Sequence, residues 1–306
     1  MKLTQAIKRK LEASRNIIRY PATLTFYSTM CFLYYLSVRF GRRALPQQTQ
    51  VVFTVTAGRT GTDTLSRIFR DVRGCCSFHE PRPSYDIIAR AARRKRWLRL
   101  GFAAWKLSLI KRTDCRIYIE TSHVLSKGFV EPFVALGLKP LFVDLRRDTR
   151  EVAISHLRKN AVPGRTPEGF KFLLSPDEDV FLPIDGWKDL SDYQLCYWYA
   201  LEMNVRSRVY RSAMEQLEIP VGIIETEELN DRDRVRALAE LIGISPSTQN
   251  IWNFGWRNVG YRGEQYRCDE DMDAPESVVI SRLESPKTPE EVLEAISSLR
   301  ELAGLQ

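Results

Sequence analysis

Residues 54–65 form a glycine-rich stretch whose side chains and backbone suit the binding of an anion. They follow the apolar run 51–53 and precede a helix-like pattern, which predicts a strand, a tight loop and a helix. Gly58 and Gly61 let the backbone bend so that successive amide groups point into one concavity, and the helix N-terminus adds positive charge. The loop also supplies a cation, hydroxyl groups and one acid: Arg59, Thr60, Thr62, Asp63 and Thr64. We expect a phosphate there, with an ordinary strand-to-helix turn as the alternative.

This loop differs from the phosphate loop of nucleoside triphosphatases. That loop places four residues between two glycines and continues with Lys and then Ser or Thr. Neither glycine is followed by a Lys-Ser/Thr pair here. The departure weakens the prediction of a Mg²⁺-dependent triphosphatase.

A second group of residues that could bind an anion lies near residue 147. Residues 140–147 are almost continuously apolar and end in charge, the pattern of a buried parallel strand. Arg147 closes this predicted strand, and Ser155 follows two helical turns later. Both side chains could reach a second phosphate.

The elements that must position these residues alternate between apolar runs and helical patterns. This alternation predicts an α/β fold: a parallel sheet flanked by helices on both faces, with one continuous core. Ligands of such sheets bind at the carboxyl ends of the strands. The loop at 56–64, a polar tip at 79–80 and the strand ends at 147 and 225–226 should therefore share one cleft.

Two segments outside the predicted strands could contact a partner. Residues 160–189 are rich in Pro, Gly and Asp, and we expect a lid or an acceptor-binding loop. Residues 87–112 form a basic helical segment with interleaved Trp97, Phe102 and Trp105. Such a segment could bind nucleic acid, an acidic acceptor or anionic lipid, and a solvated helix face is the default.

The composition is that of a globular protein with a basic balance. The chain has 306 residues, and 46 Lys and Arg against 38 Asp and Glu give a net charge of +8. This charge suits polyanionic partners or an anionic membrane face. The six cysteines show no Cys-x-x-Cys spacing and accompany no His cluster, so we expect neither a metal site nor a disulfide framework.

Residues 1–45 read as a separate N-terminal segment. Residues 1–20 are basic, whereas residues 21–38 carry no charge and are closed by arginines. The uncharged run is at the lower limit for a membrane-spanning helix, and its tyrosines also suit a helix lying in the membrane interface. Alternatively, this hydrophobic helix packs on the domain that follows at 50–306. Membrane contact through residues 21–38 is thus possible, and a membrane-associated or cytoplasmic location is favoured over a type II arrangement in the secretory lumen.

The two anion-binding motifs together resemble the sulfotransferases that use 3′-phosphoadenosine 5′-phosphosulfate (PAPS). In that family a Lys or Arg followed by Ser/Thr-Gly-Thr binds the 5′-phosphosulfate, and residues 59–62 read Arg-Thr-Gly-Thr. An Arg at a later strand end and a Ser eight residues on hold the 3′-phosphate, and Arg147 and Ser155 have that spacing. The motifs occur in the family's order, and the resemblance covers roughly residues 50–265.

The resemblance implies a P-loop-like fold and transfer of a sulfuryl group from PAPS to a hydroxyl, without a metal. The motifs look more like the Golgi and bacterial carbohydrate and tyrosylprotein branches than the cytosolic branch. We therefore expect a carbohydrate or glycoconjugate acceptor, which could be an anionic glycan. In branches with a loop Arg the general base is a Glu after the first helix; Glu80 stands there, and His79 is the alternative base. Arg59 would neutralise charge on the leaving nucleotide, and His123 and His156 are expected to be structural.

The chain departs from the family pattern at three points. The loop cation is Arg59, where cytosolic members usually have Lys. Asp63 stands where a neutral Thr is common, and we expect its side chain to turn toward the backbone or neighbouring arginines. The Lys-Gly loop that closes over the nucleotide is not evident; residues 258–263, with Tyr261 and Arg262, could replace it, and Tyr261 or Trp256 could hold the adenine.

Two other functions compete with sulfuryl transfer. A nucleotide-dependent kinase with a degenerate phosphate loop would need a Mg²⁺ ligand and a loop Lys. A non-enzymatic nucleic-acid-binding module would use the basic segment and would bind with a steep salt dependence. We favour the sulfotransferase and expect no nucleic-acid partner.

Overall fold

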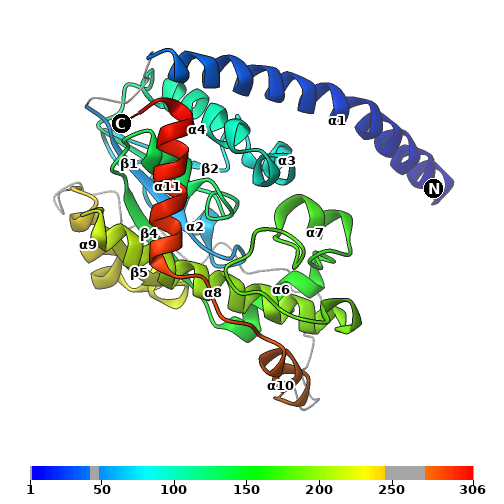
Figure 1. Ribbon diagram of the computed structural model, residues 1–306. Coiled ribbons are helices and arrows are strands. Elements are labelled where there is room, and N and C mark those ends of the chain that lie inside the picture. Colours follow the sequence, from blue (N-terminus) through cyan, green and yellow to red (C-terminus); the bar gives the residue numbers. More distant parts are fainter. Residues whose placement is uncertain (1, 42–47, 245–272, 306) are drawn as a thin grey trace.

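A computed structural model describes residues 2–41, 48–244 and 273–305, with side chains from residues 21 and 275 onward in the first and last ranges. Its centre is a sheet whose five strands are all parallel, in the order β2-β3-β1-β4-β5. The strands are β1 (Gln50–Val55), β2 (Cys75–His79), β3 (Ile117–Thr121), β4 (Leu141–Arg146) and β5 (Val221–Glu225). The predicted parallel α/β sheet is confirmed (Figure 1).

Helices connect the strands and cover the sheet. The longer ones are α1 (Lys2–Arg39), α4 (Arg96–Ile110), α6 (Thr149–Arg158), α8 (Asp192–Gln216), α9 (Arg232–Leu241) and α11 (Pro289–Ala303). The shorter ones are α2 (Thr62–Ile68), α3 (Ala89–Arg94), α5 (Val130–Ala135), α7 (Pro167–Phe172), α10 (Asp273–Ser281) and the turns η1 (Tyr85–Ile87), η2 (Trp187–Asp189) and η3 (Glu227–Asn230). The final helix, α11, begins at a capping box formed by Thr288 and Glu291.

The buried apolar residues form three clusters. Successive strand residues point to opposite faces, so Val51 and Phe53 of β1 pack with α4, α5 and α11, whereas Val52 packs with α2 and α9. A third cluster joins α6, the first half of α8 and residues 161–190. The expected single continuous core is therefore wrong, since the sheet itself separates the first two clusters.

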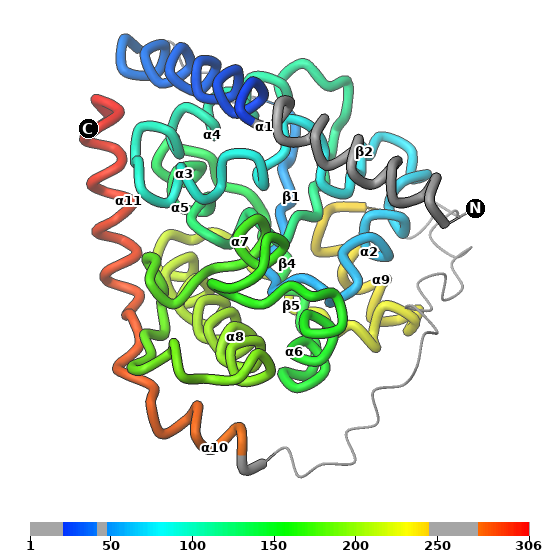
Figure 2. Tube along the Cα trace, turned by 90° about the vertical axis from the view of Figure 1, so that its right-hand side faces the viewer, coloured from blue at the N-terminus to red at the C-terminus, as the bar shows by residue number. Residues whose placement is uncertain are grey.

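Helix α1 lies along the outer edge of the molecule, beside α4 (Figures 1 and 2). Tyr27, Cys31 and Val38 are buried against the domain. The two helices approach so closely that a Cβ on Gly101 would lie 1.9 Å from the Cys31 carbonyl oxygen. The uncharged stretch is thus the second half of a longer helix, and one of its faces packs on the domain.

A membrane-spanning helix was one interpretation of residues 21–38. Among the helices within the described ranges, none is both long enough and apolar enough to cross a bilayer.

The basic segment 87–112 is neither one continuous helix nor a solvated face. It breaks at Lys95, between α3 and α4, and most of α4 is buried. Lys106 is buried and pairs with Glu120 at 2.9 Å, while Arg93 pairs with Glu178. These two cations are bound within the fold, because a buried charge requires a partner.

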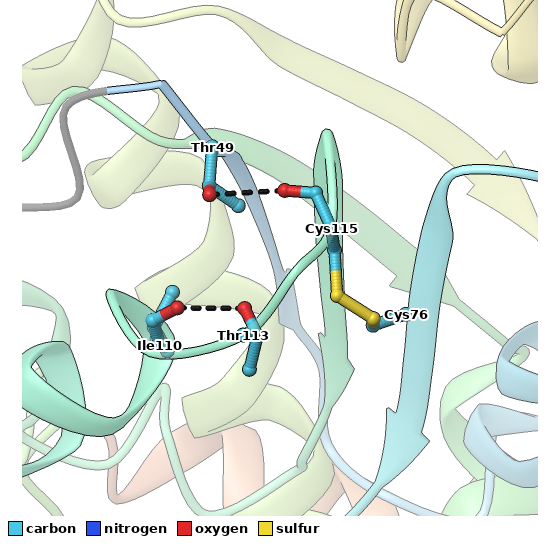
Figure 3. Close-up of a disulfide and its surroundings, with 5 residues drawn as sticks. All are labelled: Thr49, Cys76, Ile110, Thr113 and Cys115. Atoms are coloured by element: carbon cyan, nitrogen blue, oxygen red, sulfur yellow. Dashed lines mark hydrogen bonds between the residues drawn. A yellow bond between two sulfur atoms is a disulfide. The ribbon is translucent and has the colours of Figure 1, made fainter.

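One pair of cysteines is joined, contrary to the expectation from their spacing. Figure 3 shows the disulfide between Cys76 of β2 and Cys115, which lies just before β3. The bond links the two neighbouring strands at their N-terminal ends. Cys31, Cys75 and Cys196 are free thiols.

Residues 160–189 contain α7 and η2 and are not an open loop. Val162, Leu173, Leu174 and Phe181 are buried in the clusters described above. The segment nevertheless reaches the strand ends, because the Phe172 ring lies 5.9 Å from the ring of His123.

Candidate active site

The carboxyl ends of the strands meet at one edge of the sheet, because all five strands are parallel. Thr226, just after β5, donates to the Thr60 carbonyl in the loop after β1 at 2.8 Å. His123, after β3, lies against Gly58 of the same loop. The structure therefore brings together the strand ends that the sequence analysis placed in one site.

The loop between β1 and α2 is held through its carbonyl groups. Side chains from four other segments donate to four of the carbonyls between residues 56 and 60: Ser126 to Thr56 (3.1 Å), Tyr199 to Ala57 (2.7 Å), Arg147 to Arg59 (2.9 Å) and Thr226 to Thr60 (2.8 Å). Within the described part of the chain, the amides of Arg59, Thr60 and Gly61 donate to no group. A rigid loop with unused amide groups can bind an anion.

The loop needs glycine at two positions. Gly58 and Gly61 have φ angles of 80° and 88°. A Cβ on Gly58 would lie 2.9 Å from Cγ of His123, and one on Gly61 would lie 2.9 Å from Cδ1 of Leu229. Arg59 between them also has a positive φ, 62°, which a residue with a side chain rarely adopts. The surrounding contacts hold Arg59 in a strained backbone conformation, and residues in such conformations are often found at functional sites.

Arg59, Arg147 and Ser155 lie together although up to 96 residues separate them in the chain. Arg59 Nε donates to Ser155 Oγ at 3.0 Å, and Arg147 donates to the Arg59 carbonyl at 2.9 Å. Burial and the positive charge of Arg147 lower the pKa of Arg59. Glu151, 2.7 Å from Arg147 Nε, offsets part of the positive charge of these two neighbouring guanidinium groups, and an anion bound beside them would stabilise them further.

A second group of polar side chains lies on the other side of the loop and begins at Glu80. Glu80 follows β2 and has a φ of 48°, another positive value outside glycine. Its Oε1 lies 3.3 Å from Nε2 of His123, and Nδ1 of His123 lies 2.8 Å from Nζ of Lys127. Lys127 also donates to the Phe172 carbonyl at 2.6 Å. The result is a continuous line of contacts from a carboxylate to a buried ammonium.

Burial controls the ionisation of this group. Burial raises the pKa of Glu80 and lowers the pKa of Lys127 well below its usual value. Burial, and then the charge of Lys127, hold the pKa of His123 well below its usual range, so its ring is neutral near pH 7. In the tautomer whose Nδ1 accepts from Lys127, the ring proton is carried by Nε2 and is directed at Glu80.

His123 and Lys127 were missed as functional candidates by the sequence analysis. They stand four residues apart directly after β3, at the strand end from which ligands in parallel sheets are bound. Their position after a predicted strand was the sequence feature that could have identified them as candidates. His79 is exposed, with its Nδ1 3.0 Å from the Thr121 carbonyl oxygen.

The remaining predicted residues have varied surroundings. His156 is buried edge-on against the Tyr199 ring, and burial lowers its pKa to about 3, as suits a structural residue. Thr60 is buried, with its hydroxyl on that of Thr56. Asp63 pairs with Arg67 at 2.8 Å, which confirms that its side chain turns to an arginine. Thr62 and Thr64 begin α2.

Part of the predicted nucleotide site lies outside the described residues. This applies to Trp256, Tyr261 and Arg262 and to the whole stretch 258–263. Over residues 2–41, 48–244 and 273–305, no three or more His, Cys, Asp or Glu side chains gather in a way that could hold a metal ion.

Comparison with known proteins does not identify a family. The chain matches no protein-family model, and it matches no curated protein in sequence.

Proposed function

We propose that this chain is a PAPS-dependent sulfotransferase that sulfates a hydroxyl of a carbohydrate or glycoconjugate. The observation that carries the proposal is the meeting of Arg59, Arg147 and Ser155 beside a loop with unused amide groups. Two cationic groups at one sheet edge suit a ligand with two separate phosphate groups. Adenosine carrying a 5′-phosphosulfate and a 3′-phosphate has this form.

The residues then take distinct roles toward the donor. The loop amides and Arg59 bind the 5′-phosphosulfate, and Arg147 and Ser155 bind the 3′-phosphate. Transfer forms a bond from the acceptor oxygen to sulfur and breaks the bond from sulfur to the bridging oxygen. Arg59 stabilises the charge that develops on the leaving adenosine 3′,5′-bisphosphate, as preorganised cations do in phosphoryl transfer.

The acceptor hydroxyl must lose a proton as it attacks, and Glu80 receives it. Glu80 is half-buried, and the raised pKa brings its basicity closer to that required near neutral pH. His123 positions the carboxylate by donating from Nε2, and Lys127 sets the tautomer of His123. His79 remains the alternative base.

Calorimetry with adenosine 3′,5′-bisphosphate and AMP tests the donor site. We expect the bisphosphate to bind more tightly, because only it has a 3′-phosphate for Arg147. A hydrogen bond to a charged group contributes about 1.5–3 kcal/mol, so Arg147→Met should weaken bisphosphate binding roughly 10- to 100-fold and leave AMP binding unchanged. Arg70→Met, at an exposed arginine beyond the end of α2, is the matched control.

Transfer is tested with labelled PAPS against glycans, glycolipids, tyrosine peptides and phenols. A labelled glycan or glycolipid product would support the acceptor class, and labelling of phenols alone would contradict it. Equal binding of AMP and the bisphosphate would overturn the donor assignment. Mg²⁺-dependent transfer of phosphate from ATP would favour a kinase instead.

A further inference from the structure

The outer face of α1 carries large apolar side chains that the fold covers only in part. Phe26, Phe32, Leu33 and Phe40 are 55%, 48%, 54% and 78% exposed. Phe26 and Leu33 are seven residues apart, about two helical turns, and so lie on one side of the helix. Phe32 lies about 100° from Leu33 around the helix, and Phe40 directly follows the end of α1. No charged residue occurs between Tyr20 and Arg39, so this side, which also exposes Thr25 and Thr29, forms an uncharged and largely apolar stripe.

The opposite face of α1 is occupied by α4, and the two helices run antiparallel. Tyr27 lies against Trp105, Cys31 against Gly101 and Tyr35 against Trp97. Tyr34 also stacks on Trp105. Three of the tyrosines that by sequence suited a membrane interface, Tyr27, Tyr34 and Tyr35, therefore contact the domain. The exposed residues are phenylalanines and a leucine, of which Phe26 and Phe32 also contact the rings of Trp105 and Trp97 edge-on, at 6.1 and 5.8 Å.

Exposed cations lie at both ends of α4, the helix beside the stripe. Arg94, Lys95 and Arg96 stand at its start, just before Trp97, whose ring lies 6.4 Å from that of Tyr35. Lys111 and Arg112 follow its end, after Ser108, which donates to the Tyr34 hydroxyl at 2.9 Å. These five α4-flanking cations are exposed, and no acidic residue occurs between positions 87 and 112.

We propose that α1 docks parallel to an anionic lipid bilayer, with Phe26, Phe32, Leu33 and Phe40 in the interface and the flanking cations against lipid phosphates. A helix with an apolar face and basic neighbours binds a bilayer through buried apolar area and attraction to anionic headgroups. The charge pattern favours this occupant over a second copy of the chain, because facing copies would bring like charges together. Docking is independent of the sulfuryl-transfer proposal.

Sedimentation of the full chain with vesicles tests docking. We expect binding to vesicles of 70% phosphatidylcholine and 30% phosphatidylserine, at least tenfold weaker binding to pure phosphatidylcholine, and a marked loss in 0.5 M NaCl, as screening of surface charge requires. Leu33→Ser together with Phe40→Ser should weaken binding roughly tenfold or more, because two apolar side chains no longer enter the interface. Circular dichroism verifies that the variant is folded.

Matched controls show whether vesicle binding depends on the apolar residues of α1 in particular or on any exposed apolar residue. Leu241→Ser and Ile280→Ser replace residues that are 46% and 56% exposed on α9 and α10, and vesicle binding should not change. Equal binding of all these variants, or of neutral and anionic vesicles, would overturn the proposal. A dimer in light scattering that Leu33→Ser with Phe40→Ser dissociates would identify a second copy as the occupant and would also overturn it.

Discussion

Glu80 and His123 show how backbone conformation and burial could prepare a general base. Glu80 directly follows His79 and Thr121, the last register pair of β2 and β3, and its amide donates to the Thr121 carbonyl at 3.3 Å, while its φ is 48°. The carboxylate then meets the Nε2 group of a histidine that burial keeps neutral. Burial raises the affinity of the Glu80 carboxylate for a proton, which is the property that a general base for the acceptor hydroxyl would need.

Substitution of Glu80 tests its role as base. Glu80→Gln keeps the size of the side chain and removes its basicity, so transfer from PAPS should fall roughly 10²- to 10⁴-fold with bisphosphate binding unchanged. The base acts when deprotonated, and burial raises its pKa above the usual 4.5. Activity should therefore decline as pH falls through that raised pKa. Rates and calorimetry across pH measure both effects.

His79→Ala is the matched neighbour for this test. His79 is exposed and bound to Thr121, so its loss should leave the transfer rate near that of the unmodified chain. If Glu80→Gln retains full turnover and His79→Ala abolishes it, His79 is the base. The two variants thus give opposite results for the two assignments.

At the scale of elements, local sequence patterns were sufficient to predict a strand or helix where its buried residues are continuous or periodic in the sequence. The strand predicted over residues 140–147 is β4 (Leu141–Arg146), and the strand, loop and helix predicted around residues 51–65 are β1, its loop and α2. The basic segment 87–112 was misread because the partners of its buried cations are remote. Arg93 binds Glu178, 85 residues away, and nothing near Arg93 in the sequence shows that contact.

The disulfide between β2 and β3 should stabilise this edge of the sheet. Cys76 and Cys115 close a loop of 39 residues, for which chain entropy predicts a contribution of roughly 2–4 kcal/mol to the free energy of unfolding. Cys76→Ser with Cys115→Ser should lose that amount in urea unfolding. Reduction of the unmodified chain should lower its stability by a similar amount.

The adjacent free thiol Cys75 provides the control. It lies on the same strand and is half-buried, and Cys75→Ser breaks no disulfide. Its unfolding free energy should stay within about 1 kcal/mol of that of the unmodified chain. Equal stability of the reduced and oxidised forms would contradict a stabilising role for the bond.

At the scale of the whole molecule, the strand order decides which predicted residues meet. The sequence indicates that Glu80, Arg59 and Arg147 follow strands, but it does not show that β3 lies between β2 and β1. That position of β3 brings His123 between the loop and Glu80, which no local pattern could reveal. The sequence therefore predicts that the site lies at the carboxyl ends of the strands, but it does not predict which side chains meet there.

The packing of α1 also bears on where the domain begins. By sequence, residues 1–45 form a segment separate from a domain at 50–306, yet Tyr27, Cys31 and Val38 belong to the same buried cluster as Phe102 of α4. Deleting residues 1–41 would expose that surface. Each fully buried apolar side chain contributes about 1.5–3 kcal/mol, so the deletion should lower the free energy of unfolding by at least about 3 kcal/mol.

Deletion of residues 2–19 is the matched control, because it ends before every α1 contact described above. The shorter deletion should unfold at nearly the same urea concentration as the full chain, whereas the longer one should unfold at a clearly lower concentration. If both deletions leave the midpoint unchanged, α1 is a separable attachment and the boundary near residue 50 is correct. If only the longer one destabilises, the helix that would contact lipid is part of the domain that holds the candidate site, and docking would then orient that domain on the bilayer.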